Sequence, residues 1–338
     1  MSLVAGRYAH RAPALAAYLI LALTGVGAAP AAVGAEEWPT RPIRVIVPQP
    51  AGGSMDANMR AMAESLEHEF GQKVVIDNRA GANGIIAGEL LAHAPGDGYT
   101  MLYTSNSFAN NQVLYRKLPF DLLRDFAPAT MVANLPGYMV LSNPQVSARN
   151  ITDLVFVARE ASARGEPLHF GSGGVGNSQH LLGELLNHRA GMQLVHVPYK
   201  GLAPMVTALL SNEVQLAFSA PTVVLPHLKT GRLTVLAYTG PHRWPGMPEV
   251  PTVAETLPGF TFEAAWHGVF LPAATSPALV ERIARDFGRA AQAPKVRGFL
   301  ETGGYVPLTQ TPAEFRVFLE AYLREMAELM RIAKLSPE

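Results

Sequence analysis

Cysteine is absent from this chain of 338 residues. Its absence excludes a cysteine nucleophile, thiolate metal ligands, disulfide bonds and a lipid-modified cysteine anchor. Charged residues are also scarce, because 27 basic and 27 acidic residues make up only 16% of the chain and cancel to a net charge of zero. Without a basic excess to neutralise phosphates, nucleic acid is not an expected partner. Apolar residues amount to 49%, which allows a sizeable core and argues against intrinsic disorder.

Long apolar runs are confined to the N-terminus, where residues 1–35 have the pattern of a secretory signal peptide. Arg7 and Arg11 precede an apolar stretch over residues 14–29, and Val33-Gly34-Ala35 supplies small residues for cleavage. A membrane anchor is the alternative interpretation, but the stretch is short against the ~20 residues needed to span a bilayer, and glycines and a proline interrupt it. We therefore expect an exported, soluble protein.

Beyond this segment, short strand-like runs alternate with helical ones, which predicts an α/β fold with parallel sheets covered by helices on both faces. The hydrophobic spacing predicts strands over residues 43–47, 73–76, 99–104, 168–170, 193–197, 214–218, 233–238 and 264–271, and helices over residues 55–70, 85–92, 151–164, 178–190 and 202–210, with a long final helix after Thr311-Pro312.

Two Leu-Pro-Gly tripeptides, at residues 135–137 and 257–259, bracket one complete strand–helix unit in the middle of the chain. The pattern predicts two lobes joined by two crossovers. The expected division is a signal peptide over residues 1–35, a discontinuous first lobe of residues 36–136 and 260–338, and a second lobe of residues 137–259.

Two glycine-rich loops each follow a predicted strand and open a predicted helix, at Pro48–Asp56 and Gly171–His180. Free N–H groups and the dipole at a helix start favour an anion, and glycines allow close approach. For the first loop, a plain turn capped by Ser54 or Asp56 is an equally good interpretation. The second loop fits G-x-G-x-x-G, but the next strand leads into Pro198-Tyr199-Lys200 without the acid that would hold a ribose, so a nucleotide is not expected.

No pattern for catalysis or metal binding stands out. Ser172 has Gly174 two residues after it but Phe170 two residues before it, so it does not match a G-x-S-x-G nucleophile elbow, and the histidines do not pair at a spacing of four residues. We therefore expect no cofactor, no metal and no enzymatic activity, with an exported α/β hydrolase as the alternative. Neither glycine-rich loop contains lysine or arginine, so we expect an anionic ligand held mainly by backbone N–H groups and small hydroxyls.

Eight short motifs are spread over nearly the whole chain after residue 35. They are Trp38–Ile43, Pro50–Gly53 with Asp56, Val75–Gly84, Asp97–Thr100, Leu118–Asp121, Asp125–Pro128, Val195–Gly201 and Val250–Glu255. Together they resemble the solute-binding proteins of tripartite tricarboxylate transporters, also called the Bug family of periplasmic receptors. One departure concerns the residues after the strand at 214–218, where family members often carry an acid or asparagine and this chain has Ser219.

The resemblance implies a monomeric periplasmic clamshell of two lobes, each a mainly parallel sheet flanked by helices, with a small organic carboxylate bound between them. It also implies a membrane permease of a tripartite transporter as partner, or a role as an orphan sensor. The loops Pro50–Gly53 and Ser172–Ser178 match the carboxylate-binding loops of the family. The candidate ligand-binding residues are Gln49, Ala51, Gly52, Gly53, Ser54, Asp56, Ser105, Asn106, Ser172, Gly173, Gly174, Gly176, Asn177, Ser178, His180, Tyr199, Ser219 and Trp266.

Overall fold

The computed structural model describes residues 38–332 and residue 335. Both sheets and the candidate site belong to one compact unit that begins at Arg41. The predicted signal peptide at residues 1–35 lies outside the described residues. Within residues 38–332, no helix combines the length and the apolar character needed to cross a membrane.

Six strands form the first sheet, in the order β11-β4-β10-β3-β1-β2. Their bounds are β1 Ile43–Val47, β2 Val74–Asn78, β3 Thr100–Ser105, β4 Phe126–Leu135, β10 Ala265–Pro272 and β11 Val306–Pro307. β1 runs parallel to β2 and β3, whereas β10 runs antiparallel to β3 and β4. The sheet is therefore mixed, because the chain leaves it through β4 and returns through β10 rather than crossing back over a helix.

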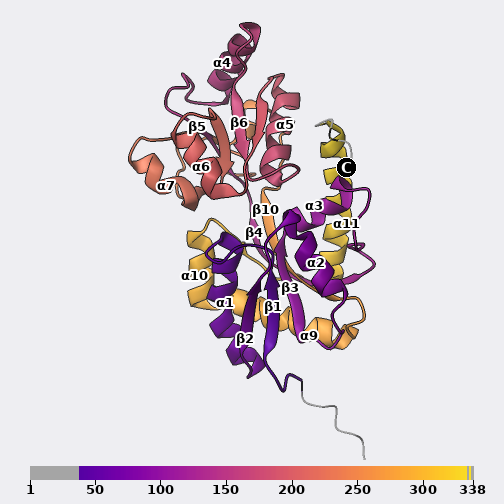
Figure 1. The fold of residues 1–338 in the computed structure, drawn as a ribbon. Helices are drawn as coiled ribbons and strands as arrows, with labels where there is room; N and C mark the ends of the chain where they lie inside the picture. Colours follow the sequence, from indigo (N-terminus) through magenta and orange to yellow (C-terminus); the bar gives the residue numbers. More distant parts are fainter. Residues whose placement is uncertain (1–37, 333–334, 336–338) are drawn as a thin grey trace, which may run out of the picture. The chain divides into compact units, whose positions relative to one another are not determined.

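Helices cover both faces of the first sheet, with α1, α9 and α10 packed together on one side and α2, α3 and α11 on the other (Figure 1). We call this sheet and its helices the first lobe. The helix bounds are α1 Ser54–Phe70, α2 Ile85–Ala92, α3 Asn106–Leu114, α9 Pro277–Gln292, α10 Pro294–Thr302 and α11 Pro312–Ile332, with a short 3-10 turn at Ala82–Gly84. In α1 the predicted apolar stripe is buried, from Met55 through Met59 to Phe70.

Five strands form the second sheet, in the order β7-β6-β8-β5-β9, and with its helices this sheet makes the second lobe. The bounds are β5 Met139–Ser142, β6 His169–Ser172, β7 Val195–Pro198, β8 Leu216–Ser219 and β9 Thr234–Tyr238, with α4 Ile151–Ala163, α5 Ser178–Ala190, α6 Leu202–Leu210, α7 Pro221–Lys229 and α8 Val253–Thr256. β6 is parallel to β7 and β8, and β5 is antiparallel to β8 and β9.

Successive residues of β6 point to opposite faces of this sheet. Phe170 packs against Gly183 of α5, while Gly171 lies against Met205 of α6. α5 and α6 therefore cover opposite faces (Figure 1). Four of the five strands, β6, β7, β8 and β9, run in one direction, so the sheet is mainly parallel as predicted, and β5, which enters from the first lobe, is antiparallel to its neighbours.

The predicted elements are confirmed, and every predicted boundary lies within two residues of the observed one. Elements that the spacing did not predict include β4, β5, α3, α7, α9 and α10. The predicted lobe boundaries stay a prediction, although β4 ends at Leu135 in the first sheet and β5 begins at Met139 in the second.

Candidate ligand-binding site

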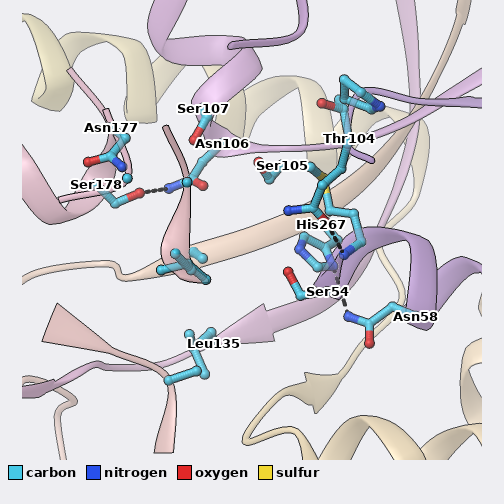
Figure 2. Close-up of a pocket in the computed structure, with 18 of the residues that line it drawn as sticks. Ser54, Asn58, Thr104, Ser105, Asn106, Ser107, Leu135, Asn177, Ser178 and His267 are labelled. Carbon is cyan, nitrogen blue, oxygen red and sulfur yellow. Dashed lines mark hydrogen bonds between the residues drawn. The ribbon is translucent and has the colours of Figure 1, made fainter. Parts of the chain in front are cut away.

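A cavity of about 810 Å³ is lined by residues of both lobes. Its walls are strand ends and helix starts, such as Pro48–Pro50 after β1, Thr104–Ser107 where β3 passes into α3, and Lys200–Leu202 at the start of α6. Figure 2 shows lining side chains of both lobes close together, among them Ser105 and Asn106 of the first lobe and Asn177 and Ser178 of the second. A cavity of this size suits a small molecule.

Five helices begin at this cavity. The lining contains the first residues of α1, α3, α5 and α6 and the residue before α7, which are Ser54, Asn106, Ser178, Leu202 and Ala220. Among these five helices only α5 is capped by the side chain of its own N-cap residue, Asn177, and Gln49 Oε1 accepts the Met55 N–H at the start of α1 at 2.7 Å. The positive ends of five helix dipoles lie at the cavity against the negative end of one, that of α10, whose last residue Thr302 also lines it, so the helix ends together favour an anion.

The charged side chains of the lining agree with this preference for an anion. No aspartate or glutamate is present among the described residues that line the cavity, and Lys200 supplies a positive charge. Asp56, the acid within the first loop, is buried and accepts hydrogen bonds from Arg60 at 2.8 Å, Gly52 N–H at 2.8 Å and Asn78 at 3.0 Å. The Arg60 hydrogen bond does most to lower the pKa of Asp56, to about 2. Asp56 is therefore ionised and holds the loop through these hydrogen bonds, and it does not line the cavity.

The glycine N–H groups of the two loops form hydrogen bonds within the loops. Gly173 N–H donates to Gln179 Oε1 at 2.9 Å, Gly174 N–H to Ser172 Oγ at 3.2 Å and Gly176 N–H to His180 Nδ1 at 3.0 Å. In the first loop Gly52 N–H donates to Asp56. These glycine N–H groups, which were expected to bind the anion, already donate to side chains. The cavity is lined instead by helix starts, amides and hydroxyls.

Seven of the eighteen candidate residues line the cavity: Gln49, Ser54, Ser105, Asn106, Gly173, Asn177 and Ser178. Two of them meet across the lobes, because Asn106 Nδ2 donates to Ser178 Oγ at 2.9 Å (Figure 2). The other candidates do not line it: Ala51, Gly52, Gly53, Asp56, Ser172, Gly174, Gly176, His180, Tyr199, Ser219 and Trp266.

Two aromatic candidates have other roles. Tyr199 donates its hydroxyl to Glu213 at 2.9 Å and packs on the core of the second lobe. Trp266 is fully buried in the core, and its ring lies edge-on to Phe315 and Tyr322 of the final helix, α11. Because successive residues of a strand face opposite ways, it is His267 that lines the cavity.

Sequence reasoning missed a polar cluster around His267. Its Nδ1 lies 2.9 Å from the Tyr103 hydroxyl and 3.1 Å from Asn58 Nδ2, and its ring lies 4.8 Å from that of Tyr305. Burial lowers the pKa of His267 to about 3, so the ring is neutral at physiological pH. Strand alternation was the available signal, but alternation alone does not say which of Trp266 and His267 faces the cavity.

Known proteins share this architecture. Residues 58–333 match the family described as "Tripartite tricarboxylate transporter family receptor". The chain belongs to this family. It is 34% identical over 316 residues to the protein BugT of Bordetella pertussis, which covers 93% of this chain and 94% of BugT. A protein of the UPF0065 group from Pseudomonas sp. (strain P51) is 39% identical over 264 residues, or 77% of each chain.

Solved structures agree with this family membership. A protein of R. palustris, solved with adipate, is 30% identical, has a TM-score of 0.81 and matches 89% of this chain and 100% of its own. The periplasmic binding protein BugD is 26% identical with a TM-score of 0.78 and the same coverage. The tricarboxylate-receptor fold, a two-lobed α/β clamshell, is therefore shown for this chain, which is a solute-binding protein of this receptor family.

The hydrolase alternative finds no support in this receptor. Ser172 Oγ does lie 2.6 Å from His196 Nε2, at hydrogen-bond distance for a nucleophile and its base. Ser172 is fully buried, however, and neither residue lines the cavity. Ser172 Oγ also donates to Gly174 O and accepts from Gly174 N–H, so it holds the loop together.

Proposed function

We propose that this protein is a non-catalytic periplasmic receptor that binds a small organic carboxylate in the 810 Å³ cavity. The observation that carries the proposal is electrostatic. Five helices begin at the cavity, Lys200 lines it, and its described lining contains no acidic residue. An anion is stabilised in such a place, whereas an ammonium finds no counter-charge.

The donors suffice for useful affinity. Each helix start contributes about 0.3–1 kcal/mol to an anion, and each hydrogen bond to a carboxylate about 1.5–3 kcal/mol. After the costs of association, a few such contacts support micromolar binding, or about −8 kcal/mol. The adipate in the R. palustris relative makes aliphatic dicarboxylates the leading ligand class. The candidate residues that line the cavity are the proposed contacts.

The remaining parts of the proposal concern location and partners. The pattern of residues 1–35 supports export to the periplasm, and the binding proteins of this family supply the precedent. We infer that the receptor is a monomer that delivers its ligand to a membrane permease of a tripartite transporter, or reports it as an orphan sensor.

A pair of substitutions tests the electrostatic argument. Ala220 and Ala293 both precede a proline at a helix start, both lack a side-chain cap, and their φ and ψ angles are nearly equal, at −59° and 143° against −58° and 135°. Ala220 lines the cavity and Ala293 does not. Ala220→Asp therefore adds a cap and a negative charge at the cavity, while Ala293→Asp adds the same cap elsewhere.

The measurement is a melting-temperature screen with matched acids and amines: succinate and putrescine, adipate and 1,6-diaminohexane, benzoate and benzylamine. We expect one or more acids, and no amine, to stabilise the wild type and Ala293→Asp, with binding weakened at least tenfold in Ala220→Asp by like-charge repulsion. Stabilisation by amines alone, or equal acid affinity in both variants, would contradict the proposal. Native mass spectrometry of freshly purified protein would then identify a bound acid.

A further inference from the structure

One donor in the cavity has no partner within the described residues. His267 projects from β10, where it lies opposite Ser105 at the end of β3, and it lines the cavity (Figure 2). It is only 2% exposed. Its Nδ1 has two partners, Tyr103 and Asn58, while no hydrogen bond joins Nε2 to any residue in the range 38–332.

The two partners determine the tautomer of the ring. The Asn58 amide nitrogen is a donor without acceptor capacity, and the Tyr103 hydroxyl can donate to the same atom. Nδ1 must therefore accept, which places the proton of the neutral imidazole on Nε2. The result is an N–H group held in a fixed direction by two buried side chains.

The surroundings keep the ring neutral. The rings that face His267 are those of Tyr103 and Tyr305, with centroids at 5.4 and 4.8 Å, and no carboxylate pairs with it among the described residues. A neutral N–H donor recognises an oxygen acceptor, and it disfavours an ammonium, which is itself a donor.

The number of donors around the cavity exceeds what one carboxylate can use, because its two oxygens offer about four acceptor sites. Five helix starts, Lys200 and His267 all line the same space. Building on the proposed function, we infer that the Nε2–H of His267 is a specificity-determining donor to a second oxygen acceptor on the ligand. That acceptor is a second carboxylate, carbonyl or hydroxyl oxygen of the acid, and Tyr103 and Asn58 are positioning residues.

Two substitutions at one position separate the donor from the ring. His267→Phe keeps the ring and removes both nitrogens, whereas His267→Gln places an amide N–H near the position of Nε2. The probes are straight-chain dicarboxylates of four to eight carbons, the monocarboxylates of the same length and 6-aminohexanoate, titrated by calorimetry into ligand-stripped protein.

We expect the wild type to bind its best dicarboxylate more tightly than the matching monocarboxylate. His267→Phe should lose roughly 10- to 100-fold in dicarboxylate affinity and less than about threefold in monocarboxylate affinity, and His267→Gln should recover most of the loss. Equal affinity of the wild type for both acid series, or equal effects of His267→Phe on both, would overturn the role of His267. Failure of the wild type to bind any acid would instead refute the proposed function.

A measurement without ligand guards against a folding defect in these variants. The nitrogen resonances of the His267 imidazole in the wild type should report a proton on Nε2 and none on Nδ1 at pH 7. Tyr103→Phe should increase the exchange between tautomers and weaken dicarboxylate binding more than monocarboxylate binding. A proton on Nδ1 in the wild type would overturn the inference.

Discussion

Acidification should destabilise this protein through a stacked pair of buried histidines in the second lobe. The rings of His180 and His196 lie 3.6 Å apart and within 11° of parallel, and Phe170 contacts both. His180 Nδ1 accepts the Gly176 N–H, so this nitrogen must be unprotonated. Glu184 is the acid facing the pair, with Oε1 4.0 Å from His180 Nε2.

Burial lowers the pKa of His180 from 6.5 to about 4, and burial together with the neighbouring His180 lowers the pKa of His196 to about 3. Below pH 6.5 the unfolded chain therefore binds protons that the folded protein does not. The free energy of unfolding falls as the pH falls from 6.5 toward the folded pKa values, by about 1.4 kcal/mol per pH unit for each ring. Between pH 6.5 and pH 5 each ring lowers the free energy of unfolding by about 2 kcal/mol.

The assay is urea unfolding at pH 7 and pH 5 of the wild type, of His196→Gln and of the exposed control His242→Gln. Burial raises the pKa of Glu184 and opposes the effect, but this contribution is common to all three proteins. We expect His196→Gln to lose about 2 kcal/mol less than the wild type between the two pH values, and His242→Gln to follow the wild type. An equal loss in the wild type and His196→Gln would refute the reasoning.

Three further predictions follow from other sites. Lys200→Gln should weaken anion binding only a few-fold, because Lys200 is exposed, and salt at about 0.5 M should reduce this loss of affinity. A loss of about a hundredfold in calorimetry would contradict a minor role for Lys200. Gly176→Ala should lower the free energy of unfolding in urea by about 1 kcal/mol or more beyond the effect of Gly165→Ala. Both glycines have a positive φ, but only at Gly176 would a Cβ meet a side chain, that of Leu114, so equal losses would argue against the clash. Asp56→Asn should cost about 2–4 kcal/mol at pH 7 by removing the carboxylate that Arg60 and Gly52 bond, and a neutral result in the same assay would show that the loop does not depend on its charge.

Local patterns predicted the regular elements well, because their signals are carried by neighbouring residues. The stripe of α1 and the loop–helix starts at Ser54 and Ser178 are examples. β4 escaped prediction because Pro128 suggests a turn. In the structure Pro128 lies opposite Phe270, beside a register shift in the pairing of β4 with β10. At such an irregularity a sheet tolerates a proline, which has no N–H to donate.

The site was predicted only in part, because its decisive contacts are not local. The sequence indicates two glycine-rich loops, but not that Gln179 and His180 use the N–H groups of the second loop. Alternation separates Trp266 from His267, yet the choice of face depends on the packing of the final helix against the first sheet. Lys200 follows a predicted strand, and only the fold brings it to the cavity.

Calorimetry of the ligand-stripped receptor against matched acids and amines tests the central claim most directly. Adipate, hexanoate, 6-aminohexanoate and 1,6-diaminohexane share one chain length and differ in the charges at their ends, and the same comparison extends to chains of four to eight carbons. The positive potential of five helix starts, with Lys200 and without an acid in the described lining, predicts binding of acids and none of diamines. Binding of a diamine, with no acid bound at any length, would contradict the account.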